Sequence, residues 1–283
     1  MRKGLSVFIS MLSLLLAVSC SKSEEGGNIF RPDIKIAILG DSISTFDGYM
    51  ASDIEGYEGQ PYSVFYPKGD VKKVKDTWWY KVTSMLGTDF DNLCNCSWGG
   101  SKVSGKSGSE TSAIVGCSTK RIADLSAKGF APDLVICYIS CNDWNDNVPL
   151  GDWSRQDPVP QEGNKTTFRE AYALMLHKIK EFYPQAIVVC LTNIEDLKRD
   201  KTPGWPSNNS SGVTVGEWNH SIREVADAMD CHVIDLQECG INYDNAASYT
   251  VDNGLHPNKA GMTLIAKKVS GDLKPIINYL SAQ

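Results

Sequence analysis

The stretch Ile36-Ala37-Ile38-Leu39-Gly40-Asp41-Ser42 determines how this chain is interpreted. Its apolar run predicts a buried strand, and its last three residues predict a turn where the strand ends. A serine just beyond a buried strand is rigidly held and open to solvent, as a nucleophilic hydroxyl must be. Far along the chain, His256 in Gly254-Leu255-His256-Pro257-Asn258 would supply the base that such a serine needs at neutral pH. The sequence therefore predicts a nucleophilic pair, Ser42 and His256.

Two more polar blocks lie between Ser42 and His256. They are Asn95-Cys96-Ser97-Trp98-Gly99-Gly100 and Ser140-Cys141-Asn142-Asp143. In their order and in the length of chain that they span, the four blocks resemble those of the SGNH (GDSL-type) hydrolase family, which is named after its Ser, Gly, Asn and His residues. The resemblance implies that Ser42 is the nucleophile and His256 the base, and that Gly100, Asn142 and the Ser42 N–H bind the oxyanion. It also implies ester hydrolysis through an acyl-enzyme, without a cofactor or a metal.

The fourth block departs from the family pattern at the residue that orients the base. The family places an aspartate three residues before the histidine, where this chain has Asn253; the nearest aspartate, Asp252, stands four before His256. Asp252 carries the charge that stabilises an imidazolium, but its loop must bulge to bring the carboxylate to the ring. We expect Asp252 in this role, because Asn253-Gly254 readily forms a turn that absorbs an extra residue. Asn253 is the alternative, and His220 is the reserve candidate for the base.

Apolar runs alternate with amphipathic patterns along the chain, which is typical of a parallel sheet covered by helices on both faces. Strands are expected at 34–39, 91–96, 134–140, 186–192 and 232–236, and helices at 77–86, 119–128, 167–183, 215–229 and 258–280. We therefore expect one three-layer α/β/α domain over 32–283, with a parallel sheet of about five strands, resembling the flavodoxin-like fold of SGNH hydrolases.

Three of the polar blocks follow predicted strands at their carboxyl ends, where open α/β sheets bind ligands. A long insertion follows each of these blocks, at 46–75, 101–118 and 144–164. Loops in such positions normally form the walls of a binding site. We expect these insertions to shape the substrate pocket.

Residues 1–19 have the layout of a secretory signal. Arg2 and Lys3 precede an apolar stretch at 5–18, and small residues follow. The apolar stretch is too short and too close to the terminus to favour a permanent membrane span. We therefore expect an exported protein.

The next residues predict a lipid anchor. Ala17-Val18-Ser19-Cys20 resembles a bacterial lipoprotein cleavage site, and lipidation of Cys20 would leave residues 20–31 as a flexible polar tether. Glu24 and Glu25, so soon after the cysteine, resemble the surface-export signal of Bacteroidetes lipoproteins. We expect an outer-membrane or cell-surface lipoprotein that contacts the membrane only through Cys20; a periplasmic or secreted protein is the alternative.

The net charge and the cysteine and histidine content indicate which partners, metals and disulfides are expected. A net charge of -6 without a long basic run argues against nucleic acid. With nine cysteines, both disulfides and buried free thiols stay open for an exported protein. One Cys-x-Cys pair and four histidines give little support for zinc, so no metal site is expected. The disulfide alternative involves Cys94, Cys117, Cys231 and Cys239.

Aromatic residues indicate the class of substrate. The chain has seven tryptophans and eleven tyrosines, and sugar rings stack on aromatic faces. Trp98 and Trp144 each lie close in sequence to an expected oxyanion residue, so we assign them to substrate binding. An exported esterase with such loops is expected to remove O-acetyl groups from glycans. The alternatives are a lipase or acyl-thioesterase of the same family, and a catalytically decayed surface protein that binds glycans.

Overall fold

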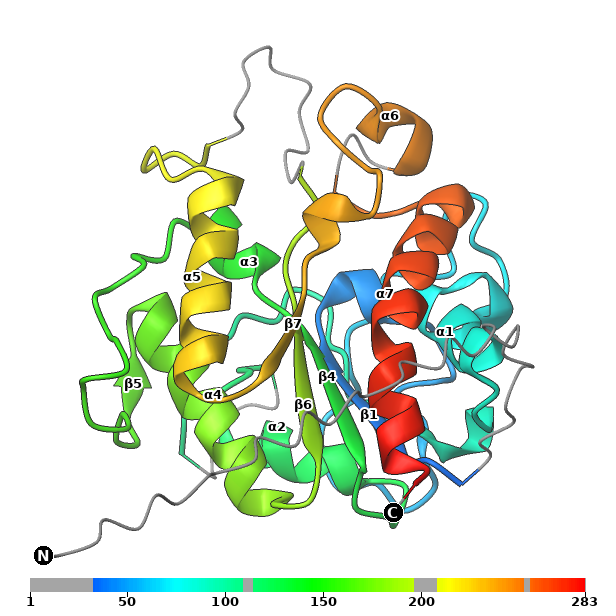
Figure 1. The fold of residues 1–283 in the computed structure, drawn as a ribbon, viewed down its shortest axis with the longest axis horizontal. Helices are drawn as coiled ribbons and strands as arrows, with labels where there is room; N and C mark the ends of the chain where they lie inside the picture. Colours follow the sequence, from blue (N-terminus) through cyan, green and yellow to red (C-terminus); the bar gives the residue numbers. More distant parts are fainter. Residues whose placement is uncertain (1–32, 109–113, 196–207, 252–254, 283) are drawn as a thin grey trace, which may run out of the picture.

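The computed structural model describes residues 33–108, 114–195, 208–251 and 255–282. Five parallel strands form the central sheet in the order β2-β1-β4-β6-β7. Their bounds are Ile36–Gly40 for β1, Leu93–Asn95 for β2, Leu134–Tyr138 for β4, Ile187–Leu191 for β6 and His232–Ile234 for β7. Helices lie on both faces of this sheet (Figure 1). The predicted three-layer α/β fold with a parallel sheet is confirmed.

Two inner strands, β1 and β4, are apolar because both faces of the sheet are covered. Every residue of these strands is buried, and strands buried on both faces are continuous apolar runs. The register pairs Ile36 with Leu134 and Gly40 with Tyr138. β1 and β4 therefore end at the same level, and the polar residues that follow them emerge along one edge of the sheet.

Each face of the sheet is covered by its own group of helices (Figure 1). α1 (Trp78–Leu86) and α7 (Lys259–Leu280) pack against each other on one face. α4 (Phe168–Phe182), α5 (Val215–Ala228) and the short α2 (Thr119–Ala123) lie on the other. The apolar stripe of α4 is buried, as its amphipathic pattern requires. The stripe consists of Phe168, Tyr172, Met175, Leu176 and Ile179.

The helix predicted at 119–128 is shorter in the structure. α2 ends at Ala123, and the chain continues as a 3-10 helix, Asp124–Ser126. The Asp124 carbonyl accepts the Ala127 N–H at 3.0 Å and the Cys96 thiol at 2.9 Å. The Cys96 thiol, which lies outside the helix, thus bonds to a carbonyl oxygen that a further α-helical turn would use as an acceptor.

Two of the insertions are joined to each other. β3 (Gly105–Lys106) and β5 (Asn164–Lys165) form a two-stranded antiparallel pair. The buried Lys178 of α4 donates to Ser107 O at 2.7 Å and to Cys117 O at 2.9 Å. The sequence predicted neither this pair nor two short helices, α3 (Cys141–Asn145) and α6 (Ala246–Tyr249). The remaining 3-10 helices are Ser42–Ser44, Ala51–Asp53, Val74–Asp76, Phe90–Asn92 and Leu236–Glu238.

All eight cysteines in the described part of the chain are free thiols. Most are buried against the sheet, where a thiol behaves as a small hydrophobe. The structure therefore agrees with the free-thiol alternative and not with disulfides among Cys94, Cys117, Cys231 and Cys239.

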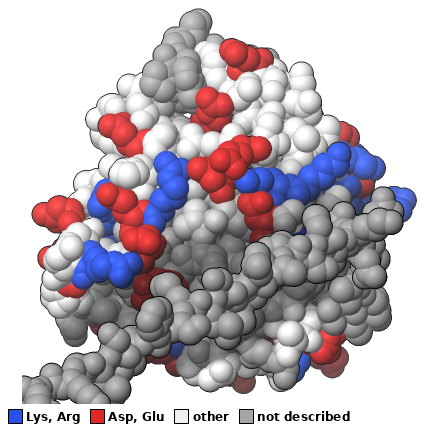
Figure 2. All heavy atoms as spheres, in the orientation of Figure 1, with Lys and Arg blue, Asp and Glu red and all other residues white. Residues whose placement is uncertain are grey.

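Residues 1–31, the predicted signal and tether with Cys20, lie outside the described residues. Within the described ranges, no helix is long and apolar enough to cross a membrane. On the face shown in Figure 2, acidic and basic side chains are interleaved.

Candidate active site

The predicted nucleophile lies in a turn that is braced from two sides. Ser42 is the first residue of the 3-10 helix that follows β1, and Asp41 is its N-cap. Asp41 Oδ1 accepts the Ile43 N–H at 3.0 Å, and Oδ2 accepts the Cys141 thiol at 3.1 Å. Burial raises the pKa of Asp41, and these two bonds partly offset that effect. Asp41 therefore holds the turn against the residue that precedes Asn142.

The predicted base is in direct contact with this serine. His256 Nε2 lies 2.8 Å from Ser42 Oγ, and both residues are buried. The ring of Phe65 stacks on the imidazole, with centroids 3.5 Å apart and planes 7° apart. Tyr66 Oη donates to Pro257 O at 2.6 Å. Residues from the insertion after Ser42 therefore hold the imidazole in place.

The predicted orienting residue lies outside the described residues. Asp252 and Asn253 both fall in the undescribed range 252–254. At its borders, the Val251 N–H donates to His256 O at 2.8 Å. The preference for Asp252 over Asn253 stays a prediction.

The predicted oxyanion residues Gly100 and Asn142 are connected through Ser101, which directly follows Gly100 and accepts a hydrogen bond from Asn142. Asn142 Nδ2 donates to Ser101 O at 2.9 Å, and the amide has a second hydrogen for a ligand. Gly100 has a φ of +77°, which favours glycine, and an added Cβ there would meet no described atom within 4 Å. Its N–H donates to no other described residue. Ser42, as the first residue of its helix, has an N–H without an acceptor inside that helix.

Asp143 fixes the loop that follows Gly100. Its Oδ2 accepts the Val103 N–H at 2.8 Å, and its Oδ1 accepts the Ser104 N–H at 2.9 Å. Asp143 has no exposed surface, and burial raises its pKa to about 6. This carboxylate therefore ties α3, which carries Asn142, to the loop of Gly100.

The two predicted substrate-binding tryptophans differ in position. Trp144 is only 2% exposed, and its Nε1 donates to Val213 O at 3.0 Å. This corrects the expectation for Trp144: the helical turn of α3 directs the ring into the core, so it cannot serve as a surface platform. Trp98 is half-buried and packs on Tyr62, with ring centroids 4.4 Å apart.

The reserve candidate His220 lies on an exposed face of α5. Its Nε2 is 3.3 Å from Glu224 Oε1, one helical turn away. The structure pairs Ser42 with His256 instead. Among the residues that the structure describes, no three His, Cys, Asp or Glu side chains are grouped as metal ligands would be.

Sequence reasoning missed two residues that contact this site. Phe65 lies in a long insertion, where only the neighbouring aromatic pair Phe65-Tyr66 could have drawn attention. Arg121 falls within the helix predicted at 119–128, but no role was predicted for its side chain; it is fully buried and donates to Gly40 O at 2.6 Å. A buried arginine cannot be recognised from its own sequence neighbourhood.

The fold is that of a family of acylhydrolases. Residues 34–273 match the model of the GDSL-like lipases and acylhydrolases, and the chain belongs to this family. The resemblance inferred from the four polar blocks is thereby confirmed, and the family implies an ester hydrolase. No curated protein matches the chain significantly.

Several solved structures share the fold. A proposed GDSL-like lipase from Bacteroides uniformis has a TM-score of 0.58 at 24% identity, over 86% of this chain and 96% of that one. A second one, from Bacteroides ovatus, has a TM-score of 0.57 at 22% identity, over 86% and 99% of the two chains. An active-site mutant of a family two carbohydrate esterase from Clostridium thermocellum has a TM-score of 0.52 at 15% identity, over 87% of this chain and 64% of that one.

Proposed function

We propose that this chain is a serine esterase in which Ser42 is the nucleophile and His256 the general base. The observation that carries the proposal is the 2.8 Å contact between Ser42 Oγ and His256 Nε2, which joins residues 214 positions apart. A serine hydroxyl is a weak nucleophile at neutral pH unless an adjacent base removes its proton. The pair has the geometry for this transfer.

The reaction then proceeds in two halves. His256 takes the Ser42 proton while Oγ attacks the ester carbonyl, and the negative oxygen accepts hydrogen bonds from the Ser42 N–H, the Gly100 N–H and Asn142 Nδ2. His256 gives its proton to the leaving alcohol, which leaves an acyl-Ser42. Water, deprotonated by His256, attacks the acyl group, and the acid departs as Ser42 regains its proton. Asp252, or Asn253 as the alternative, orients the imidazole in this proposal.

Acetylated glycans are the proposed substrates. The half-buried Trp98 next to Gly99-Gly100 offers an aromatic face beside the site, and the fold resembles that of a carbohydrate esterase. The lipase alternative rests on the proposed activity of the two Bacteroides proteins of similar fold. The intact Ser42–His256 contact favours an enzyme over a decayed binding protein.

The predicted signal and Cys20 place this esterase outside the cytoplasm in our proposal. A lipid on Cys20 would anchor it to the outer membrane or cell surface, with residues 20–31 as a tether. Glycans outside the cell would then be within its reach.

Hydrolysis of a chromogenic acetate ester tests the proposed function. Ser42→Ala should lower turnover at least ~10³-fold while the circular dichroism spectrum stays unchanged. Ser97→Ala is a matched control, because Ser97 is also buried near the end of a strand and its hydroxyl has no described hydrogen-bond partner. Full activity in Ser42→Ala would reject the assignment.

A further inference from the structure

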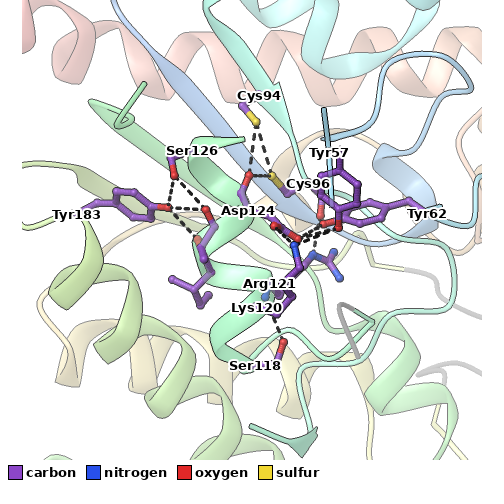
Figure 3. A network of polar contacts seen from close by, with 12 residues as sticks. Tyr57, Tyr62, Cys94, Cys96, Ser118, Lys120, Arg121, Asp124, Ser126 and Tyr183 are labelled. Atoms are coloured by element: carbon purple, nitrogen blue, oxygen red, sulfur yellow. Dashed lines mark hydrogen bonds and ion pairs between the residues drawn. The ribbon is translucent and has the colours of Figure 1, made fainter. Parts of the chain in front are cut away.

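A fully buried arginine lies beneath the candidate site. Arg121 belongs to α2 and has no exposed surface. Figure 3 shows it beside Asp124, with the rings of Tyr57 and Tyr62 nearby. Its guanidinium carbon lies 5.5 Å from the centroid of the Tyr62 ring. Burying a cation costs free energy unless hydrogen bonds replace its hydration, so the bonds that Arg121 makes indicate why it is there.

These bonds reach three separate segments of the chain. Arg121 Nη2 donates to Gly40 O at 2.6 Å, Nε to Cys96 O at 2.7 Å and Nη1 to Ser101 Oγ at 3.1 Å. Gly40 is the last residue of β1, and Cys96 directly follows β2. One planar group thus joins the ends of two strands to the loop that contains Ser101.

Two of these three acceptors lie close in sequence to a residue of the proposed reaction. Gly40 stands two positions before Ser42, and Ser101 directly follows Gly100. Ser101 O also accepts the bond from Asn142 Nδ2. A shift of the guanidinium would therefore be transmitted to the nucleophile turn and to two of the proposed oxyanion donors.

We propose that Arg121 is a positioning residue that keeps the oxyanion donors in register with Ser42. This inference rests on the proposed function, since it assigns no contact between Arg121 and the substrate. Oxyanion stabilisation requires donors at defined positions, and a misplacement of about 1 Å can cost ~10²-fold in rate. A buried apolar side chain of similar volume would fill the same space without the cost of burying charge. An apolar residue would lack the planar set of N–H donors that the guanidinium supplies.

Lysine cannot reproduce these contacts. An arginine offers five N–H donors in a rigid plane, whereas a lysine offers one compact ammonium on a flexible stem. Arg121→Lys keeps the charge and much of the volume, but it cannot reach Gly40, Cys96 and Ser101 at once. This substitution therefore tests the planar arrangement of N–H donors at residue 121 and not its positive charge.

The test compares kcat and KM for a chromogenic acetate ester with the melting temperature of each variant. Arg121→Lys should lower kcat ~10- to 100-fold with KM nearly unchanged. Lys178→Met is the matched control: Lys178 is also a buried cation that donates to two backbone carbonyls, but those belong to Ser107 and Cys117. The control should lower the melting temperature as much and leave kcat unchanged. Wild-type kcat in folded Arg121→Lys would overturn the proposal.

A double-mutant cycle separates positioning from a general loss of stability. Asn142→Ala removes one of the donors that Arg121 is proposed to position, so Arg121→Lys should lower kcat by a smaller factor in Asn142→Ala than in wild type. Effects that multiply would overturn the proposal. If Arg121→Lys does not fold, Ser101→Ala removes a single acceptor of the guanidinium and takes its place, and unchanged kcat there overturns the proposal as well.

Ser42→Ala in the same series keeps the two proposals apart. Activity in Ser42→Ala would refute the proposed function. An inactive Ser42→Ala beside a fully active Arg121→Lys would refute only the role of Arg121.

Discussion

The imidazole of His256 is held by an aromatic face as well as by its contact with Ser42. The Phe65 N–H donates to Thr45 Oγ1 at 2.8 Å, and Thr45 Oγ1 donates to Ser42 O at 3.0 Å. The residue stacked on His256 is thus bonded to the turn that carries Ser42. This link fixes the plane of the imidazole relative to Ser42 Oγ.

Replacing Phe65 should therefore impair catalysis more than stability. Phe65→Leu removes the flat surface that lies 3.5 Å from the imidazole, and we expect kcat to fall ~10-fold, because a general base acts only in a defined orientation. Phe168→Leu, in the core of α4, is the control and should lower the melting temperature without changing kcat. Steady-state kinetics on an acetate ester checks both variants; equal kcat for Phe65→Leu and wild type would contradict the role.

Asp252 and Asn253 should differ strongly on substitution. A carboxylate stabilises the imidazolium that forms when His256 takes a proton, and an amide cannot supply that charge. Asp252→Ala is expected to lower turnover ~10²- to 10⁴-fold, and Asn253→Ala far less. The reverse order would make Asn253 the orienting residue, and two unaffected variants would leave a Ser42–His256 dyad.

The contact between Ser42 and His256 was predictable, but the positions of some other side chains were not. Ser42 was predictable because it follows a buried strand whose end forms the edge of the sheet. Trp144 was placed wrongly because nearness to Asn142 in sequence does not say which way a ring points. Arg121 and Phe65 were missed because their roles depend on contacts with residues far away in sequence. Local patterns thus identify reacting groups better than the residues that hold them.

Between elements, Asp143 joins α3 to the loop after Gly100 and should make stability depend on pH. Burial raises its pKa to about 6 from 3.8. Between these values the folded state holds a proton that the unfolded chain has released. The contribution of Asp143 to the free energy of unfolding is therefore fully present below about pH 4, and it is lost as the pH rises through 6. The shift corresponds to ~3 kcal/mol.

Urea unfolding of wild type and Asp143→Asn at pH 4.5 and pH 7 measures this contribution. The asparagine does not titrate, so groups common to both proteins cancel in the difference. The stability of wild type relative to Asp143→Asn should be greater at pH 4.5. A difference that does not change with pH would show that Asp143 titrates normally.

The secondary structure was largely predictable because it follows from apolar periodicity. All five strands of the sheet were expected, although each is one to three residues shorter than predicted. Where α2 ends, the Asp124 carbonyl accepts the thiol of Cys96, a residue distant in sequence that no local pattern contains. The pairing of β3 with β5 likewise joins two insertions that are distant in sequence.

For the whole molecule, the predicted lipid on Cys20 can be tested by cell fractionation. Cys20→Ala should move the protein from the membrane fraction to the soluble extracellular or periplasmic fraction, because a single acylated residue is the only anchor expected. Acetate esterase activity per molecule should stay unchanged. Labelling with a fatty-acid analogue that appears on wild type and not on Cys20→Ala would support the anchor, and membrane association of the unlabelled variant would contradict it.

We expect the surface of the molecule to favour short acyl groups. In the part of the chain that the structure describes, the exposed large hydrophobic side chains are few: Tyr49, Val64, Val159, Phe182 and Tyr279. A long acyl chain needs a continuous apolar surface, and each buried CH₂ would contribute about 0.8 kcal/mol to binding. We therefore expect longer acyl chains to gain no binding free energy from the described surface. Turnover should therefore fall steeply from acetyl to octanoyl esters. In a panel of acylated polysaccharides, acetate should be released from an acetylated member, and butyrylated members serve as controls. A rise of kcat/KM with chain length would assign the protein to the lipase or thioesterase alternative.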